Sequence, residues 1–386
     1  MIVWAKREIA RGIISDDAVD LASARLLSSI IQGHHQRVGR EHHVKAGFGT
    51  RLLRKFTVRT VPGLYRTQSA FVILRQLFQT YGLRFNMGKI RFKQERKMVT
   101  QNPNLLGTNF PGGSLTLGGD TTINRLGFGA MRLCGPGVWG EPLDLLGAKR
   151  VLTRAVELGI TLIDTADAYG PEVNERFIAE TLYPYPKGLI VATKGGLVRP
   201  RREAWERNGR PEHLRAACEA SLRRLKLERI DIYQLHAPDP QVPRDESVGA
   251  LAELQSEGKI RHIGLSNVSF NELRRAQHIA PIVSVQNRYN FSERLSEDVL
   301  AECEKGGLAF LPWHPLAAGG DAAGGGALGR VARRLGATLV QVAIAWLLAR
   351  SPVMVPIPGT SSLAHLDENV AAAQIPLSTE DLHELS

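Results

Sequence analysis

The chain has 386 residues, of which 43% are hydrophobic and 23% charged, a composition that excludes a collagen-like or wholly disordered protein. A net charge of +11 would suggest a nucleic-acid or acidic-membrane partner, but the excess lies at one end. Residues 1–97 contain 19 basic and 6 acidic side chains, whereas residues 98–386 contain 30 and 32. We therefore expect no nucleic acid on the larger part, and no apolar run approaches the ~20 residues that span a bilayer.

The three cysteines, Cys134, Cys218 and Cys303, lie far apart and form no Cys-x-x-Cys pair. This spacing predicts reduced thiols, with neither a disulfide framework nor a zinc site. The N-terminus lacks an apolar core followed by small residues, so we expect no secretory signal. Together these features predict a cytoplasmic protein without a bound metal.

The first 97 residues are hard to assign, because short apolar pieces are mixed with scattered Arg and His side chains and no periodic pattern continues. Histidine pairs at 34–35 and 42–43 lack Cys or carboxylate partners at metal-ligand spacing. The basic stretch 89–97 would suit a nucleic-acid-binding arm, but we favour a plainer interpretation. Residues 1–97 are expected to be a basic N-terminal extension that is poorly structured or results from a misassigned start.

From residue 98 onward, short β-rich runs alternate with amphipathic helices, which is typical of a parallel α/β fold. Residues 114–124 predict a β-hairpin around a turn at 118–120. This arrangement predicts a (β/α)8 TIM barrel for 98–386, with the hairpin at its N-terminal end. The eight strands, each followed by a helix, are expected near 125–130, 161–165, 189–194, 230–235, 261–265, 282–286, 308–313 and 353–357.

An open, doubly wound sheet is the alternative architecture. The dinucleotide fingerprint of that fold, Gly-x-Gly-x-x-Gly after the first strand, is incomplete, because Gly127 and Gly129 are not followed by a third glycine at the required spacing. A phosphate-binding Walker loop is also missing from the sequence. The barrel is therefore the preferred prediction.

Four polar side chains follow consecutive predicted strands. Asp164 ends the second strand and Tyr169 follows in its loop, Lys194 ends the third strand, and His236 ends the fourth. Barrel enzymes build their active sites at the carboxyl ends of the strands. The alternation of side chains along a strand should direct Lys194 into the barrel mouth. These four residues are the candidate catalytic group.

The charges of this group indicate proton transfer. A lysine is costly to bury without an anion, and Asp164 is its natural partner. The ammonium is expected to lower the pKa of Tyr169 from about 10, so that the phenol can donate or accept a proton near neutral pH. His236 can hydrogen-bond the same substrate oxygen, and the sequence offers no carboxylate cluster for a metal.

Six short motifs occur in strand order. They are Asp-Thr-Ala-Asp-Ala-Tyr-Gly (164–170), Thr-Lys-Gly-Gly (193–196), Gln-Leu-His (234–236), Gly-Leu-Ser-Asn (264–267), Val-Gln-Asn-Arg-Tyr-Asn (285–290) and Ile-Pro-Gly-Thr (357–360). Through these motifs the sequence resembles the aldo-keto reductase family over 114–386. The resemblance implies reduction of a carbonyl compound by a nicotinamide cofactor. Tyr169 would then be the general acid, tuned by Lys194 and Asp164, and His236 would orient the carbonyl.

The resemblance also implies a cofactor site without a Rossmann motif. Ser266, Asn267 and Gln286 would hold the nicotinamide carboxamide, and Trp313 would stack on the nicotinamide ring. Further along, a helix opening after 359 would offer its N-terminal amides to a phosphate, and two residues on that helix would approach the adenine. The remaining positions that the resemblance implies are Pro315, Leu316, Gly359, Thr360, Ser361, His365, Glu368 and Asn369.

The chain departs from the family at the phosphate site. Many NADPH-using members carry a lysine after Ile-Pro and an arginine six residues later, where this chain has Gly359 and His365. With fewer cations near the 2′-phosphate, the sequence does not decide between NADPH and NADH, although Thr360, Ser361 and a charged His365 can still bind that phosphate. We expect NADPH as the cofactor, with NADH as the alternative.

Two loops above the predicted barrel mouth are candidates for substrate recognition: 134–140, with Trp139, and 199–208, with Trp205. Their tryptophans and arginines suggest a flat or partly anionic small carbonyl compound, and packing on the surface is the alternative role of the two tryptophans. Three stretches resemble a bacterial branch of the family close to the pyridoxal reductases (pyridoxine 4-dehydrogenases): 135–140, 182–186 and 357–362.

The sequence leaves two other classes of function open. Potassium-channel β subunits share the implied fold, bind NADPH and act on a partner protein, so a regulatory NADPH-binding module is the alternative to an enzyme. The basic segment 1–97 leaves a nucleic-acid-associated protein as a third class. Physiological substrate, oligomeric state and reaction direction are not predicted by the sequence.

Overall fold

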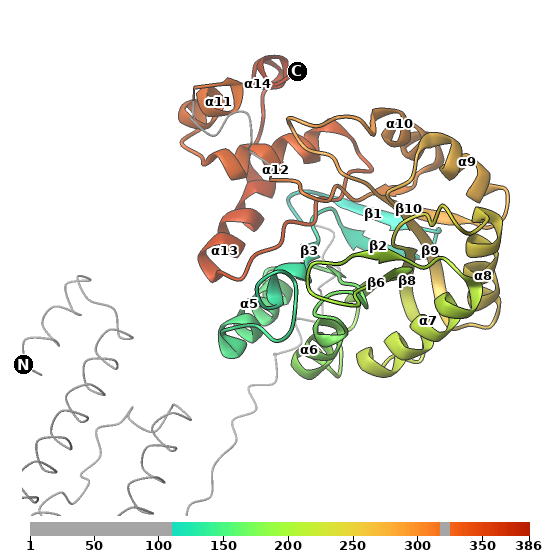
Figure 1. Cartoon of the computed structure of the whole chain (residues 1–386). Coiled ribbons are helices and arrows are strands. Elements are labelled where there is room, and N and C mark those ends of the chain that lie inside the picture. The colour runs from blue at the N-terminus through green and yellow to red at the C-terminus, as the bar shows by residue number, and fades with distance from the viewer. Residues whose placement is uncertain (1–109, 317–324) are drawn as a thin grey trace, which may run out of the picture. The chain divides into compact units, whose positions relative to one another are not determined.

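A curled sheet of parallel strands forms the centre of the described part of the chain, with helices outside it (Figure 1). The computed structural model describes residues 110–316 and 325–386, and the predictions for residues 1–97 lie outside this part. The sheet has seven strands, which lie at the first seven predicted positions and whose neighbours all run parallel. In spatial order they are β3 (Phe128–Gly129), β4 (Leu162–Asp164), β5 (Ile190–Gly195), β8 (Ile230–Leu235), β9 (Ile260–Ser266), β10 (Ile282–Gln286) and β11 (Ala309–Phe310).

The segment predicted as the eighth strand, 353–357, is not a regular strand, yet it connects both edges of this sheet. On one side, Phe310 N donates to Val353 O at 2.9 Å; on the other, Gly127 N donates to Pro356 O at 2.9 Å. Prolines at 356 and 358 have no N–H to donate, which interrupts a regular ladder. The sheet is nevertheless joined edge to edge, as in an α/β barrel.

An antiparallel hairpin, β1 (Ser114–Leu117) and β2 (Thr121–Asn124), precedes the first barrel strand. Its buried side chains Leu117 and Ile123 belong to the same apolar cluster as Leu162 and Ile232, which point into the barrel. The hairpin therefore supplies part of the interior packing, below the strand ends that carry the polar groups.

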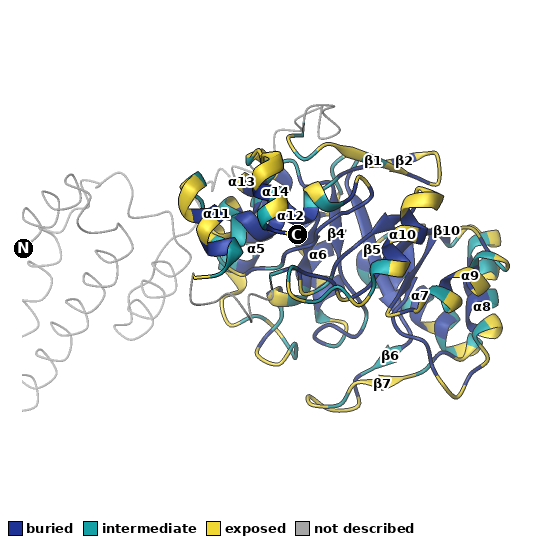
Figure 2. Cartoon of the chain, turned by 90° about the horizontal axis from the view of Figure 1, so that it is seen from above, coloured by how far each residue is buried: buried dark blue, intermediate teal, exposed yellow. Residues whose placement is uncertain are grey.

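Amphipathic helices cover the outside of the strands, and their inward faces are buried while their outward faces are exposed (Figure 2). On α7, for example, Leu214, Cys218 and Leu225 pack toward the strands. A second short hairpin follows β5 and is formed by β6 (Leu197–Val198) and β7 (Glu206–Arg207). The helices are α5 (Leu145–Glu157), α6 (Val173–Leu182), α7 (Pro211–Leu225), α8 (Arg244–Ser256), α9 (Phe270–Gln277), α10 (Glu297–Gly306), α11 (Ala327–Leu335), α12 (Leu339–Arg350), α13 (Leu363–Ala371) and α14 (Thr379–Glu384), with 3-10 turns η2 (Ala130–Leu133) and η3 (Ala372–Gln374).

Within the described residues, a search for membrane-spanning helices finds no single helix that is long and apolar enough. The pair α11 and α12 passes together by length and composition, although the two helices are bent by 101° where they meet. In the fold, α12 packs Val342, Trp346 and Leu347 into the core beside the strands.

The half-buried Arg125 lies just before β3, and its side chain bonds to the end of α12 and to the segment that follows it. These bonds connect the first and last parts of the barrel. Its Nη2 donates to Leu348 O at 2.7 Å and to Ser351 O at 2.5 Å, and its Nε donates to Met354 O at 3.3 Å. We predict that Arg125→Met lowers the free energy of unfolding by about 2–4 kcal/mol, because these carbonyls lose a charged donor. Urea unfolding measures this, with the exposed Arg229→Met as control. Equal stability of the two variants would contradict the prediction.

Candidate active site

The ends of β4, β5 and β8 bring the predicted polar side chains together. These strands are neighbours, and the register pairs Asp164 with Ala192 and Lys194 with Gln234. Ile190 and Ala192 point into the barrel, so Lys194, two residues further, follows them on the same face. His236 comes two residues after Gln234, immediately beyond the end of β8. The predicted direction of Lys194 is therefore what the structure shows.

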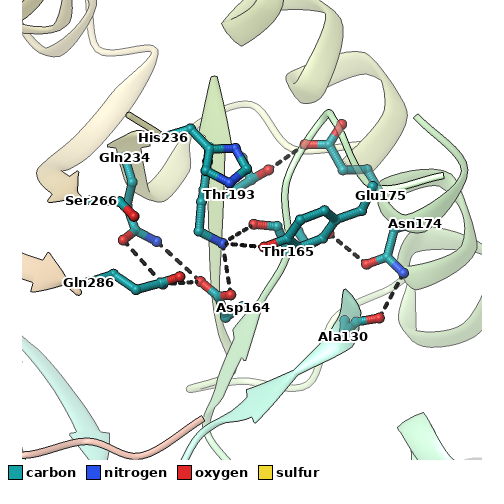
Figure 3. A network of polar contacts seen from close by, with 12 residues as sticks. Ala130, Asp164, Thr165, Asn174, Glu175, Thr193, Gln234, His236, Ser266 and Gln286 are labelled. Carbon is teal, nitrogen blue, oxygen red and sulfur yellow. Dashed lines mark hydrogen bonds and ion pairs between the residues drawn. The ribbon is translucent and has the colours of Figure 1, made fainter. Parts of the chain in front are cut away.

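Asp164 is the centre of a buried hydrogen-bond network (Figure 3). Its Oδ2 accepts from Lys194 Nζ at 2.8 Å. Its Oδ1 accepts from Gln234 Nε2 at 3.2 Å and from Gln286 Nε2 at 2.8 Å. Both carboxylate oxygens are therefore paired, and the negative charge is held in one orientation beside the ammonium.

Lys194 is fully buried, and all three of its N–H donors have acceptors. Besides Asp164, Nζ donates to Thr165 O at 2.8 Å and to Tyr169 Oη at 3.4 Å. The ammonium also lies 5.0 Å from the centre of the Tyr169 ring. It therefore connects the carboxylate to the phenol within the barrel mouth.

The electrostatics correct one expectation. We predicted that the Lys194 ammonium would lower the pKa of Tyr169, but burial raises this pKa, and the nearby positive charge only partly offsets the effect. Burial also acts to lower the pKa of Lys194, but Asp164 and Tyr169 outweigh it and the net shift is upward. The ammonium is thus retained, and Tyr169 is a protonated phenol, the form that can donate a proton.

His236 is held beside the phenol in its neutral form. Its ring centre lies 5.8 Å from that of Tyr169, at an interplanar angle of 82°. Burial, and then the charge of Lys194, lower its pKa well below the usual value. Its backbone is fixed on both sides, because its N donates to Gly195 O at 2.9 Å and its O accepts from Asn267 Nδ2 at 2.9 Å. In the described part of the chain Nδ1 is buried and has no hydrogen-bond partner.

Two threonines beside the buried network, one just after β4 and one on β5, anchor these strand ends to α6 (Figure 3). Thr165 Oγ1 donates to Asn174 Oδ1 at 2.7 Å, and Thr193 Oγ1 donates to Glu175 Oε1 at 2.5 Å. The fully buried Glu175 is in turn paired with Arg224 Nε on α7 at 2.6 Å. Each threonine is the chain neighbour of Asp164 or Lys194, so these bonds fix the strand ends from behind.

Gln234 and these anchoring residues have no predicted role from the sequence. A signal was present for Gln234, because it lies two residues before His236 and therefore on the same strand face. Glu175 is harder to identify from sequence, since its partners Thr193 and Arg224 are 18 and 49 residues away. No local pattern joins those positions.

The residues predicted to hold a nicotinamide carboxamide lie at neighbouring strand ends. Ser266 ends β9 and is buried, and its Oγ accepts from Asn267 Nδ2 at 3.0 Å. Asn267 Oδ1 accepts from Trp313 Nε1 at 2.9 Å, which orients the indole. Gln286 ends β10, and its amide nitrogen is already bonded to Asp164. Its carbonyl oxygen is the group left to accept from a carboxamide.

The predicted phosphate-binding residues follow the segment that closes the barrel. Gly359 packs so closely on β3 that a Cβ there would lie 2.4 Å from Gly129 O. Ser362 caps the N-terminus of α13 by accepting from His365 N at 3.4 Å. Pro315, Thr360 and Asn369 are buried, Leu316, Gly359 and Glu368 are half-buried, and Ser361 and His365 are exposed. Among these side chains only those of Ser361 and His365 are exposed, and the Glu368 carboxylate already accepts a hydrogen bond from Thr338 Oγ1.

Both predicted substrate tryptophans lie next to Tyr169. The Trp205 ring meets the Tyr169 ring edge to face at 6.5 Å, with an interplanar angle of 72°. Trp139 forms a parallel bridge with Gly170, the residue after Tyr169. The described residues contain no group of three or more His, Cys, Asp or Glu side chains that could hold a metal. The site therefore combines a protonated phenol, a neutral imidazole and an aromatic rim.

The lowered pKa of His236 makes stability depend on pH. As the pH falls below about 6.5, the unfolded chain binds this proton while the folded protein does not, so stability decreases. The slope is at most about 1.4 kcal/mol per pH unit, and we predict that His236→Gln removes it. Urea unfolding of wild type and variant at pH 7.5 and pH 5 provides the measurement. A difference between the two proteins that is the same at both pH values would argue against a buried neutral imidazole.

The comparisons with known proteins agree with this geometry. A model of the aldo/keto reductase family matches residues 125–386. An uncharacterised oxidoreductase of Schizosaccharomyces pombe is 50% identical over 68% of this chain and 85% of the relative, and pyridoxine 4-dehydrogenase of Escherichia coli is 44% identical over 69% and 95%. An aldo-keto reductase from Klebsiella pneumoniae, solved in complex with NADPH, has a TM-score of 0.59 and 26% identity over 70% and 93%. The chain belongs to the aldo/keto reductase family.

Proposed function

We propose that this oxidoreductase uses NADPH to reduce an aldehyde or ketone to an alcohol. One observation carries the proposal: the buried Tyr169 hydroxyl accepts a hydrogen bond from Lys194, whose charge is balanced by Asp164. The phenol stands beside the neutral His236 at the carboxyl ends of the barrel strands. A proton donor with a cation behind it suits a reaction in which negative charge develops on a carbonyl oxygen.

The roles of the side chains follow from their contacts. A bound nicotinamide would supply hydride to the carbonyl carbon. Tyr169 donates its proton to the carbonyl oxygen, and the Lys194 ammonium stabilises the phenolate that results. Asp164 keeps the ammonium in place, since Gln234 and Gln286 fix its other oxygen. The neutral His236 orients the substrate by hydrogen-bonding the same oxygen.

The donor set at the strand ends fits a nicotinamide cofactor. We assign Ser266, Asn267 and Gln286 to the carboxamide and Trp313 to the ring face, since Asn267 orients the indole. The backbone from 359 to 362 and the exposed His365 would bind phosphate groups at the start of α13. NADPH is the proposed cofactor because the similar protein from Klebsiella pneumoniae binds it, and NADH is the alternative.

Pyridoxal is the first substrate to test. Pyridoxine 4-dehydrogenase of Escherichia coli is 44% identical, and the Trp205 ring beside Tyr169 suits a flat aromatic aldehyde. A regulatory NADPH-binding role on a partner protein is the second candidate. The cytoplasmic location and the assignment of 1–97 as an extension to a barrel formed by 98–386 stay predictions.

Removal of the proton donor is the decisive test of the enzyme proposal. In the full chain, Tyr169→Phe should lower kcat/KM for NADPH-dependent reduction of pyridoxal or of a small aldehyde by about 100-fold or more. The NADPH dissociation constant should stay unchanged. The matched control is Tyr183→Phe, at a residue that is 53% exposed. NADPH binding without turnover of any carbonyl compound would favour the regulatory role, and full activity of Tyr169→Phe would refute the mechanism.

Two variants separate the cofactor contacts. Trp313→Ala should raise the dissociation constants of NADPH and NADH alike, by about tenfold, because both lose the same aromatic face. His365→Ala should raise the dissociation constant of NADPH but leave that of NADH unchanged, since only NADPH carries the 2′-phosphate. Fluorescence titration of each variant with both cofactors gives the four constants. If His365→Ala changed the dissociation constants of NADPH and NADH equally, His365 would not contact the 2′-phosphate.

A further inference from the structure

Arg199, which follows the short strand β6, is a buried arginine whose hydrogen-bonding capacity is nearly used up by backbone. Its side chain donates from Nε to Ala204 O at 3.0 Å, from Nη1 to Val138 O at 3.2 Å and from Nη2 to Gly137 O at 3.2 Å. Nη2 also donates to Arg202 O. Four of the five guanidinium N–H donors are thus engaged. The residue is 7% exposed, so it has little left to offer an anionic ligand.

These bonds join the two loops that border the Tyr169 hydroxyl. Gly137 and Val138 belong to the loop after η2, whereas Ala204 belongs to the loop between β6 and β7. The first loop is also tied to the catalytic loop, because Gly170 N donates to Val138 O at 3.3 Å and Gly140 N donates to Gly170 O at 2.6 Å. Arg199 therefore fixes the β6–β7 loop relative to Tyr169, together with Arg202 of the same loop, whose Nη2 donates to Pro136 O at 2.5 Å.

The flat faces of the guanidinium contact both tryptophans of the rim. Arg199 Cζ lies 3.7 Å from the centre of the Trp205 ring and 5.4 Å from that of Trp139, within the range of cation–π attraction. Trp205 remains 41% exposed and meets Tyr169 edge to face. The indole of Trp205 is thus held by the arginine and also meets the ring of Tyr169.

We propose that Arg199 is a positioning residue that sets substrate specificity by holding Trp205 and Trp139 as an aromatic wall beside Tyr169, which selects flat aromatic aldehydes. A planar ring packed against Trp205 presents its carbonyl oxygen to Tyr169 and His236. The guanidinium does not bind substrate charge, because its donors are committed to the loops. This inference rests on the proposed reductase function and narrows its substrate class.

The test compares two aldehydes in the full chain. Arg199→Met should lower kcat/KM for benzaldehyde or pyridine-4-carbaldehyde about tenfold more than for propanal, mainly through KM. Arg199→Lys should behave like Arg199→Met, because an ammonium has no planar face and cannot reach four carbonyls. Arg201→Met, an exposed arginine of the same loop, is the matched control and should leave the aromatic-to-aliphatic ratio unchanged.

A second set of variants tests the wall directly. Trp205→Ala should reduce the ratio of kcat/KM for the aromatic aldehyde to kcat/KM for propanal. The double variant Arg199→Met/Trp205→Ala should show no lower ratio than the single variants, because both changes remove the same aromatic wall. Unchanged NADPH affinity and a single cooperative thermal transition show that the barrel is intact, although the thermal midpoint of Arg199→Met should fall because four carbonyls lose a donor. If Arg199→Met does not fold, Trp205→Ala decides. Equal losses for both aldehydes, or full rescue by Arg199→Lys, would overturn the inference while the reductase function stands. Wild type without aldehyde turnover would overturn both.

Discussion

A buried ion pair, Lys194 with Asp164, is the constraint on which the rest of the site depends. A fully buried ammonium is tolerated only when charge and hydrogen bonds compensate its lost hydration. Here the lysine meets a carboxylate, a backbone carbonyl and a phenol. The carboxylate needs donors of its own, and the two glutamine amides supply them. The polar groups in the barrel mouth thus stabilise one another through a continuous series of hydrogen bonds.

Side chains on both faces of the strands contribute to the site. Inward-facing side chains form the proposed catalytic group, and their outward-facing neighbours Thr165 and Thr193 are bonded to Asn174 and Glu175 on α6. An inward side chain cannot shift along its strand without breaking an outward bond. Such two-sided fixation limits reorganisation during proton transfer, which is how preorganised sites stabilise developing charge. The helices therefore contribute to the site although none of their side chains donates the proton.

Much of this arrangement could be predicted from the sequence, because alternation along a strand is a local signal. This alternation predicted that Lys194 points into the barrel mouth, and the sequence pattern identified seven strand positions. The eighth segment is irregular because its prolines lack a backbone N–H to donate. The direction of the Tyr169 pKa was wrong, since the sequence shows the neighbouring cation but not the extent of burial. Arg199 was missed as a specific residue because its partners Gly137 and Val138 are more than 60 residues away.

The rim loops depend on the catalytic loop as well. Val138 adopts a φ of 55°, which is unfavourable for a β-branched residue. Its carbonyl accepts from both Gly170 and Arg199, and these two bonds offset the strain. Because Gly170 directly follows Tyr169, the position of the rim and the position of the proton donor are set by one shared stretch of backbone. The proposed aromatic wall and the proposed proton donor are therefore coupled through the chain itself.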